Sequence, residues 1–183
     1  MDRLVALLRG INVGGHRKLP MARLRELAEQ LGWSDVETYV QSGNLVFTAP
    51  ARTGEDAAAS ALSAAVEEAF GYDVPVVVRT RAHLADIVAA DPFGARADNP
   101  ARYQVLFLGQ APDPAVVADL DPDAIAPDAF LLRGREVYLW TPDGVRDSRL
   151  TRALSEQRLG TTATARNWRT VLRLLDMTGA DGG

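Results

Sequence analysis

The order of apolar segments in the first 80 residues limits the possible folds more than any other feature of the sequence. A nearly continuous apolar run over 3–9 predicts a buried strand, and apolar residues at helical spacing over 21–31 predict a helix. Alternating residues around a Ser-Gly-Asn turn predict a hairpin over 36–48. An alanine-rich helix over 53–70 and a strand over 74–80 complete a strand–helix–strand–strand–helix–strand order.

The second part of the chain repeats this order. The predicted elements are strands over 103–108, 130–133, 136–140 and 161–164, and helices over 114–120, 148–159 and 166–177. We therefore expect an α+β fold of two ferredoxin-like halves, packed or interwoven, with mostly antiparallel sheets. The expected organisation is a first half over 1–80, a connecting helix and turn over 81–101, a second half with a C-terminal helix over 102–177, and a flexible tail over 178–183.

Composition excludes several classes of protein. The 183 residues contain no cysteine, which excludes disulfides, thiolate nucleophiles and thiolate metal sites. No apolar run approaches the roughly 18 residues of a membrane span, and the first ten residues lack the apolar length and cleavage site of a signal peptide. A hydrophobic fraction of 47% excludes wholesale disorder. We expect a soluble, cytoplasmic protein that does not associate with membranes.

Charge is distributed unevenly along the chain, whose net charge is −4. Residues 1–50 carry 6 basic and 5 acidic side chains, residues 51–132 carry 5 and 13, and residues 133–173 carry 9 and 4. A net acidic chain is a poor general nucleic-acid binder, because phosphate attraction supplies most non-specific affinity. A locally basic surface can still bind one anion. All basic residues except Lys18 are arginines, which suit bidentate recognition of phosphate or carboxylate.

Separate motifs along the chain are distinctive. They include Arg9-Gly10-Ile11-Asn12-Val13-Gly14-Gly15, Tyr39-Val40-Gln41-Ser42-Gly43-Asn44, Tyr138-Leu139-Trp140-Thr141-Pro142-Asp143-Gly144 and Ala163-Thr164-Ala165-Arg166-Asn167-Trp168. In this order they resemble the bacterial domain-of-unknown-function 1697 family over nearly the whole chain. The resemblance implies two ferredoxin-like halves and no established activity. Where the family commonly has Ser-Lys-Leu, this chain has Ser148-Arg149-Leu150. Because guanidinium stays protonated, this difference favours binding over amine catalysis there.

The first candidate site is the glycine-rich loop between the first strand and the first helix. Backbone N–H groups in such a loop can cradle a phosphate. Gly10 and Gly15 have G-x-x-x-x-G spacing, but His16-Arg17 follows instead of the Lys-Ser/Thr of a P-loop, which argues against a P-loop NTPase. The alternative is that the glycines serve a tight turn that Asn12 brackets. The candidate ligand-binding residues here are Arg9, Asn12, Gly14, Gly15, Arg17 and Lys18.

The second candidate site is the turn over 41–44. Gln41 and Asn44 could orient a ligand through their amides, and Ser42 could act as a nucleophile or a ligand-binding hydroxyl. A serine nucleophile needs an adjacent base and an oxyanion hole, and no serine-elbow pattern surrounds Ser42. Serine, glycine and asparagine are typical turn residues, so the local chemistry favours a hairpin turn.

The arginine-rich C-terminal part is the third candidate. In the expected helix over 166–177, helical geometry places Arg166, Arg169 and Arg173 opposite the apolar face, as on an ordinary solvated helix. Arg146, Ser148 and Arg149 open the preceding helix and could meet an anion there. They could equally pair with the acidic middle of the chain.

The leading hypothesis is that the protein binds a small anionic, phosphorylated ligand where these three segments meet. His16 would be the catalytic candidate if the protein is an enzyme. No cofactor or metal site is expected, because His16 and His83 lack metal-ligand spacing. A nucleic-acid-binding module is the first alternative. Its base-stacking residues would be strand aromatics, namely Tyr39, Phe47, Tyr103 and Phe107. A protein-interaction scaffold without catalysis is the second alternative.

Overall fold

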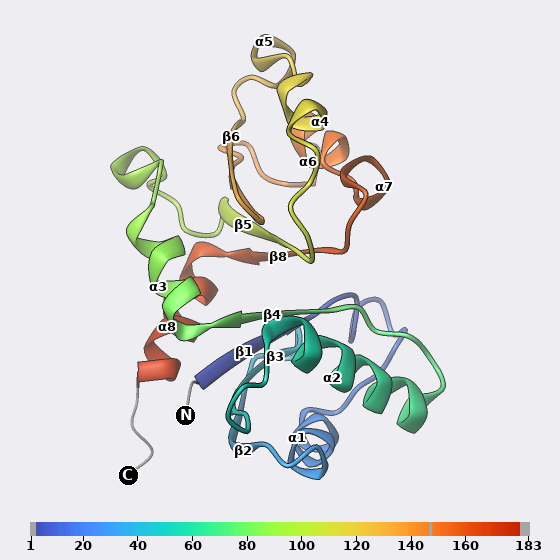
Figure 1. The fold of residues 1–183 in the computed structure, drawn as a ribbon. Coiled ribbons are helices and arrows are strands. Elements are labelled where there is room, and N and C mark those ends of the chain that lie inside the picture. Colours follow the sequence, from blue (N-terminus) through green and yellow to red (C-terminus); the bar gives the residue numbers. More distant parts are fainter. Residues whose placement is uncertain (1–2, 147, 180–183) are drawn as a thin grey trace. The chain divides into compact units, whose positions relative to one another are not determined.

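A computed structural model describes residues 3–146 and 148–179 (Figure 1). The described residues up to Asp86, together with those from Arg173 on, form one compact unit, and Ile87–Leu172 form the second. The elements of the first part of the chain are β1 (Arg3–Leu8), α1 (Met21–Gln30), β2 (Ser34–Tyr39), β3 (Asn44–Thr48), α2 (Glu55–Phe70), β4 (Val76–Thr80) and α3 (Arg81–Ala89). The expected strand–helix–strand–strand–helix–strand order is confirmed.

The first sheet has the strand order β2-β3-β1-β4, and every neighbouring pair is antiparallel. This is the ferredoxin-like arrangement, in which each helix connects two strands that are not neighbours. One face of the sheet packs on helices α1 and α2 (Figure 1), because alternate residues of β1 and the apolar stripe of each helix are buried in one core. The core residues include Leu4, Leu8, Leu24, Phe47 and Leu62.

The antiparallel pairing brings three connections to one end of this sheet. The last residues of β1 lie opposite the first residues of its neighbours, with Leu7 paired to Asn44 and Leu8 paired to Val76. The loop after β1, the β2–β3 turn and the α2–β4 connection therefore lie at the same end. This topology explains why two of the three sequence-predicted segments become neighbours.

The second part of the chain has the same topology. Its elements are a 3-10 turn, η1 (Gly94–Arg96), then β5 (Tyr103–Leu108), α4 (Pro114–Ala118), α5 (Pro122–Ile125), β6 (Ala129–Arg133), β7 (Glu136–Trp140), α6 (Arg149–Ala153), α7 (Glu156–Leu159), β8 (Ala163–Asn167) and α8 (Trp168–Gly179). The strand order is β6-β7-β5-β8, again all antiparallel. The predicted fold class of two ferredoxin-like halves is confirmed.

The two halves correspond strand by strand. Val5 of β1 pairs with Arg79 of β4, and Val105 of β5 pairs with Arg166 of β8. Both arginines are almost fully buried, at 1% and 7% exposure. In each half a helix begins immediately after the last strand. A side chain at the strand's end accepts a backbone N–H bond from that helix, Thr80 from His83 and Asn167 from Thr170. The structure thus shows a repeat that has no obvious counterpart in sequence identity.

The predicted elements of the second half differ from the observed ones in several places. The final helix begins at Trp168 and not at 166, because β8 extends through Asn167. The expected helix over 148–159 is divided into α6 and α7, and α5 was not predicted. Helix α8 also continues through Gly179, with Thr178 buried, while 180–183 lie outside the described residues.

The placement of Arg166 on a solvated helix face was therefore also wrong. Its guanidinium donates to the Thr164 hydroxyl at 2.8 Å and to the Ala165 carbonyl at 2.8 Å. Burial lowers the pKa of Arg166 to about 10, because desolvation disfavours the charged form. Over 3–146 and 148–179, no helix combines the length and the apolar character needed to cross a membrane.

Candidate functional site

The glycine-rich loop after β1 is anchored by backbone hydrogen bonds at its start. The Leu8 N–H donates to the Gly43 carbonyl at 2.8 Å, and the Arg9 N–H donates to the Pro75 carbonyl at 2.9 Å. The first bond ties the loop to the β2–β3 turn, and the second ties it to the α2–β4 connection. The base of the loop is therefore held from both sides before the chain leaves the sheet.

The tip of the loop is a tight two-residue turn. The His16 N–H donates to the Val13 carbonyl at 3.1 Å, and Gly14 and Gly15 between them have φ of +58° and +79°. Consecutive positive φ values are those of a type I′ turn, which glycine adopts without steric cost. Val13 is 67% exposed beside this turn. This backbone agrees with the alternative interpretation, in which the two glycines serve a tight turn.

Asn12 is the clamp of the loop. Its side-chain N–H₂ donates to the Leu19 carbonyl at 3.0 Å and to the Gln41 carbonyl at 2.9 Å, and its Oδ1 accepts from the Leu19 N–H at 2.9 Å. Asn12 itself has φ of +54°, which asparagine tolerates better than most residues. One side chain therefore closes the loop and joins it to the β2–β3 turn. These bonds agree with the alternative interpretation, in which Asn12 brackets the turn.

The β2–β3 turn packs tightly on the base of the loop. Gly43 is buried with φ of +83°, and a Cβ placed there would lie 2.7 Å from Ile11 Cδ1 and 2.9 Å from Leu8 Cβ. Asn44 is fully buried in β3, and its amide donates to the Tyr39 carbonyl at 2.9 Å and to the Ser42 hydroxyl at 3.2 Å. These bonds are those of a hairpin turn, so the amide of Asn44 serves the turn itself.

Tyr72 forms a third side of the site that sequence reasoning missed. Its hydroxyl donates to the Lys18 carbonyl at 3.0 Å, which attaches the α2–β4 connection to the end of the loop. Burial raises the pKa of Tyr72, and the positive charge of Arg17 opposes that shift. Nothing in the local sequence signals this contact, because it joins residues 54 positions apart.

The loop presents a basic surface. Arg9, His16, Arg17 and Lys18 are all exposed, and the sequence from Arg9 to Arg25 contains no acidic residue. Gly14, Gly15 and Gln41 are exposed beside them. We call the exposed residues of 9–18, together with Gln41 and Ser42, the basic loop surface. The hydrogen bonds of Asn12 and Tyr72 and the close packing of Gly43 hold the backbone of this surface in place. Its basic side chains therefore extend from a fixed backbone.

The segment around Ser148 belongs to the second unit. Ser148 is buried as the N-cap of α6, where its hydroxyl accepts from the Thr151 N–H at 2.9 Å and donates to Asp128 Oδ2 at 2.6 Å. Arg149 is exposed and donates to the Ala124 carbonyl at 3.3 Å, and Arg146 is exposed. Ser148 thus has a structural role, and the meeting of this segment with the loop in one site stays a prediction.

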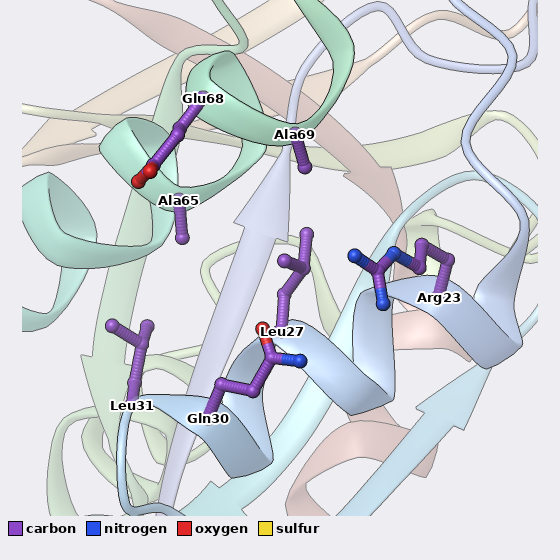
Figure 2. Close-up of a pocket in the computed structure, with 7 residues that line it drawn as sticks. All are labelled: Arg23, Leu27, Gln30, Leu31, Ala65, Glu68 and Ala69. Atoms are coloured by element: carbon purple, nitrogen blue, oxygen red, sulfur yellow. The ribbon is translucent and has the colours of Figure 1, made fainter.

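A hollow of about 460 Å³ lies between α1 and α2, and none of the sequence-predicted site residues lines it. Figure 2 shows Leu27, Ala65 and Ala69 directed into it from the two helices. Arg23, at the edge of the hollow, forms an ion pair with Glu26 at 2.7 Å. The small alanines of α2 leave this space where larger side chains would close it. No group among its lining residues suggests a reaction.

The remaining histidine has a structural role. His83 Nδ1 lies 3.4 Å from Glu55 Oε1, and the same carboxylate oxygen accepts from the Thr80 N–H at 2.7 Å. This contact joins the start of α2 to the start of α3. Within 3–146 and 148–179, no three His, Cys, Asp or Glu side chains are grouped as metal ligands.

Most strand aromatics considered for base stacking are buried. Phe47, Tyr103 and Phe107 are at most 1% exposed. Tyr103 stacks on Trp168 with ring centroids 4.6 Å apart and donates to Asp91 at 2.8 Å, and desolvation raises its pKa. Side chains held this way belong to the core and cannot stack on nucleic-acid bases.

Comparisons with known proteins found one family whose model matches the chain and a solved structure with a similar fold. The model of a family described as "Protein of unknown function (DUF1697)" matches residues 1–138. The structure of the conserved bacterial protein SP0830 from Streptococcus pneumoniae is similar with a TM-score of 0.77 and 22% sequence identity, covering 97% of this chain and 98% of that chain. No curated protein matches the chain. At this identity the structural similarity shows the fold alone.

Proposed function

The chain belongs to the DUF1697 family of proteins of unknown function, and we propose that it binds a small anionic, phosphorylated ligand at the basic loop surface. The observation that carries this proposal is the Asn12 clamp, which holds a loop of exposed cations in one shape through three hydrogen bonds. A fixed frame lowers the entropy that a ligand must remove on binding.

Each part of the surface has a stated role in this proposal. Arg9 and Arg17 supply guanidinium groups for charge-assisted bonds to phosphate oxygens, and Lys18 adds a point charge. The exposed Gly14–Gly15 turn offers backbone N–H groups, which suit an oxyanion. Gln41 can orient the rest of the ligand, whereas Asn12 and Asn44 hold the frame.

The lack of cysteine and the similarity in fold to a bacterial protein fit a protein of the cytoplasm, where phosphorylated metabolites are abundant, so we place the binding function there. If the bound ligand is also transformed, His16 is the imidazole at the basic loop surface that could exchange a proton with it. The nucleic-acid alternative is less favoured, because three of its four stacking aromatics, Phe47, Tyr103 and Phe107, are buried.

A thermal-shift experiment at low salt tests the proposal. Inorganic phosphate, sugar phosphates, nucleotides and short RNA are compared side by side. A ligand at about 100 times its dissociation constant adds about 2.7 kcal/mol to the free energy of unfolding. For a chain of this size we expect a rise in Tm of about 5 °C or more. Arg17→Gln should reduce the rise.

Arg52→Gln is the matched control, because Arg52 is an exposed arginine just beyond β3, at the opposite end of the same sheet. It should leave the rise in Tm unchanged. No response to any phosphorylated compound, or a response that Arg9→Gln and Arg17→Gln both leave intact, would overturn the proposal. A response to RNA alone would favour the nucleic-acid alternative.

A further inference from the structure

The two halves form the same backbone joint at the end of their first strand. In the second half, the Leu108 N–H donates to the Arg135 carbonyl at 2.9 Å, and the Gly109 N–H donates to the Thr162 carbonyl at 2.8 Å. These bonds correspond to the two that hold the base of the glycine-rich loop in the first half. The second half therefore shows what this joint needs when only the fold is at stake.

The connections around the joint are longer in the first half. Residues 9–20 lie between β1 and α1, whereas residues 109–113 lie between β5 and α4. The β2–β3 turn contains residues 40–43, whereas the β6–β7 turn contains Gly134 and Arg135. Short connections are thus sufficient for this fold, so the additional residues of the first half need another explanation.

Two valines in these longer connections are the most exposed large hydrophobic side chains among the residues that the structure describes. Val13 is 67% exposed in the glycine-rich loop, and Val40 is 50% exposed in the β2–β3 turn. Each valine is adjacent in sequence to one partner of the hydrogen bond between Asn12 and Gln41. Val13 is therefore part of the basic loop surface, and Val40 borders it.

The backbone of Val40 is strained. Its φ is +52°, in the left-handed region where a β-branched residue is a genuine outlier. The shorter turn of the second half places a glycine at positive φ instead, Gly134 at +61°. A half-exposed valine gains little from burial to offset this strain, so stability alone does not account for valine at position 40. Strained residues of this kind occur most often at functional sites.

Basic side chains accompany both valines. Arg9, His16, Arg17 and Lys18 are exposed in the same loop as Val13, and no acidic residue occurs between Arg9 and Arg25. The Asn12–Gln41 bond brings the turn that contains Val40 to this loop. The surface therefore offers positive charge and apolar area together, which is complementary to a molecule with an anionic group and an apolar group.

We propose that Val13 and Val40 bind the apolar part of the phosphorylated ligand, which is the phosphate monoester of a small, mainly apolar alcohol or phenol. This inference rests on the function proposed above for the basic loop surface. The guanidinium groups bind the phosphate, and the valines cover the carbon skeleton. A body rich in hydroxyls gains little from two valines and loses hydration beside them, so the surface disfavours sugar phosphates.

Two phosphate esters of equal size test this preference. Propyl phosphate and glycerol 1-phosphate share a three-carbon chain and the same charge, and they differ in two hydroxyls. Isothermal titration calorimetry at low salt compares them with methyl phosphate and inorganic phosphate. One buried CH₂ group strengthens binding about fourfold. Propyl phosphate should therefore bind about tenfold more tightly than methyl phosphate, and glycerol 1-phosphate should bind about as weakly as methyl phosphate.

Threonine variants test the two valines directly. Val13→Thr and Val40→Thr keep the β-branched shape and replace one methyl group with a hydroxyl. Each should weaken the binding of propyl phosphate about three- to tenfold and leave inorganic phosphate unchanged, whereas Arg17→Gln should weaken both. Leu131→Thr is the matched control, because Leu131 is 44% exposed but lies on β6, and it should change neither.

The strain at Val40 gives an independent measurement. Asparagine tolerates a positive φ better than valine does. Val40→Asn should therefore raise the Tm of the ligand-free protein by about 2 °C and weaken the binding of propyl phosphate. A lower Tm in Val40→Asn would show that this side chain stabilises the fold, and its assignment to the ligand would be wrong.

The possible results separate this inference from the function on which it rests. If inorganic phosphate binds but propyl phosphate binds no more tightly than glycerol 1-phosphate, this inference is wrong and the proposed function stands. The same conclusion follows if Val13→Thr and Val40→Thr both leave the preference unchanged. If no phosphate compound binds, both are wrong. Vesicles of phosphatidylcholine and phosphatidylglycerol are tested alongside, and binding to these alone would assign the valines to a lipid surface and overturn the inference.

Discussion

At the scale of single residues, Asn12 determines the shape of the candidate site. It combines a positive φ with three side-chain hydrogen bonds that reach two segments, one of them 29 residues away. Asparagine carries two hydrogen-bond donors and an acceptor on a short side chain, a combination that few other residues offer. The role of Asn12 could be anticipated from the sequence as a bracket of the turn, but its bond to Gln41 depends on the sheet.

We predict that Asn12→Ala destabilises the protein and weakens anion binding together. Each lost hydrogen bond contributes about 0.5–1.5 kcal/mol, so the free energy of unfolding should fall by about 2 kcal/mol. Urea denaturation measures this loss, and hydrogen exchange of 10–19 shows whether the loop opens. Asn12→Asp is the control, because it keeps the acceptor for Leu19 and removes both donors. An unchanged stability in Asn12→Ala would contradict the clamp.

At the scale of elements, the joint between β1 and the β2–β3 turn depends on Gly43. A Cβ at this position would approach Ile11 and Leu8 more closely than real Cβ atoms do, and the φ of +83° already disfavours a side chain. Two separate reasons therefore require glycine here. Because β3 and the base of the loop are both backbone-bonded to this joint, displacing the turn would disturb both.

We predict that Gly43→Ala lowers the free energy of unfolding by about 2–4 kcal/mol, the sum of a positive-φ cost and overpacking. Gly15→Ala is the matched comparison. Gly15 has φ of +79°, but a Cβ there meets nothing within 4 Å, so only the backbone cost of about 1 kcal/mol remains. Thermal or chemical denaturation of both variants measures the difference. Equal losses would show that the packing of Gly43 on Ile11 is unimportant.

The same scale shows where sequence patterns succeed and fail. Periodicity identified β1, α1 and α2, because long apolar patterns at one spacing have a single good interpretation. Periodicity failed at Arg166, because a short strand and a helix follow each other there without an intervening loop. In the sequence pattern alone, a buried arginine also cannot be distinguished from an exposed one. Burial of that guanidinium is decided by strand pairing with β5, which local sequence does not reveal.

At the scale of the whole molecule, the order of the elements along the sequence predicted that one topology occurs twice. It could not predict how the two halves differ. Strand order follows from the succession of elements. The strained backbone of Val40 does not follow, since a valine in a turn is unremarkable until its φ is known. Tyr72 belongs to the candidate site for a similar reason, because its hydroxyl meets Lys18 only after α2 and β4 are in place.

The attachments of the glycine-rich loop have a consequence for the order of events during synthesis. The loop leaves the ribosome before the segments that hold it, because its backbone partners are Gly43 and Pro75, and its side-chain partners include Gln41 and Tyr72. The loop can take its final shape only after the chain has emerged through about the start of β4. In a shorter nascent chain, the same basic side chains would lie on a loop that lacks these hydrogen bonds. The basic loop surface can therefore form only after the first half of the chain has been synthesised almost completely.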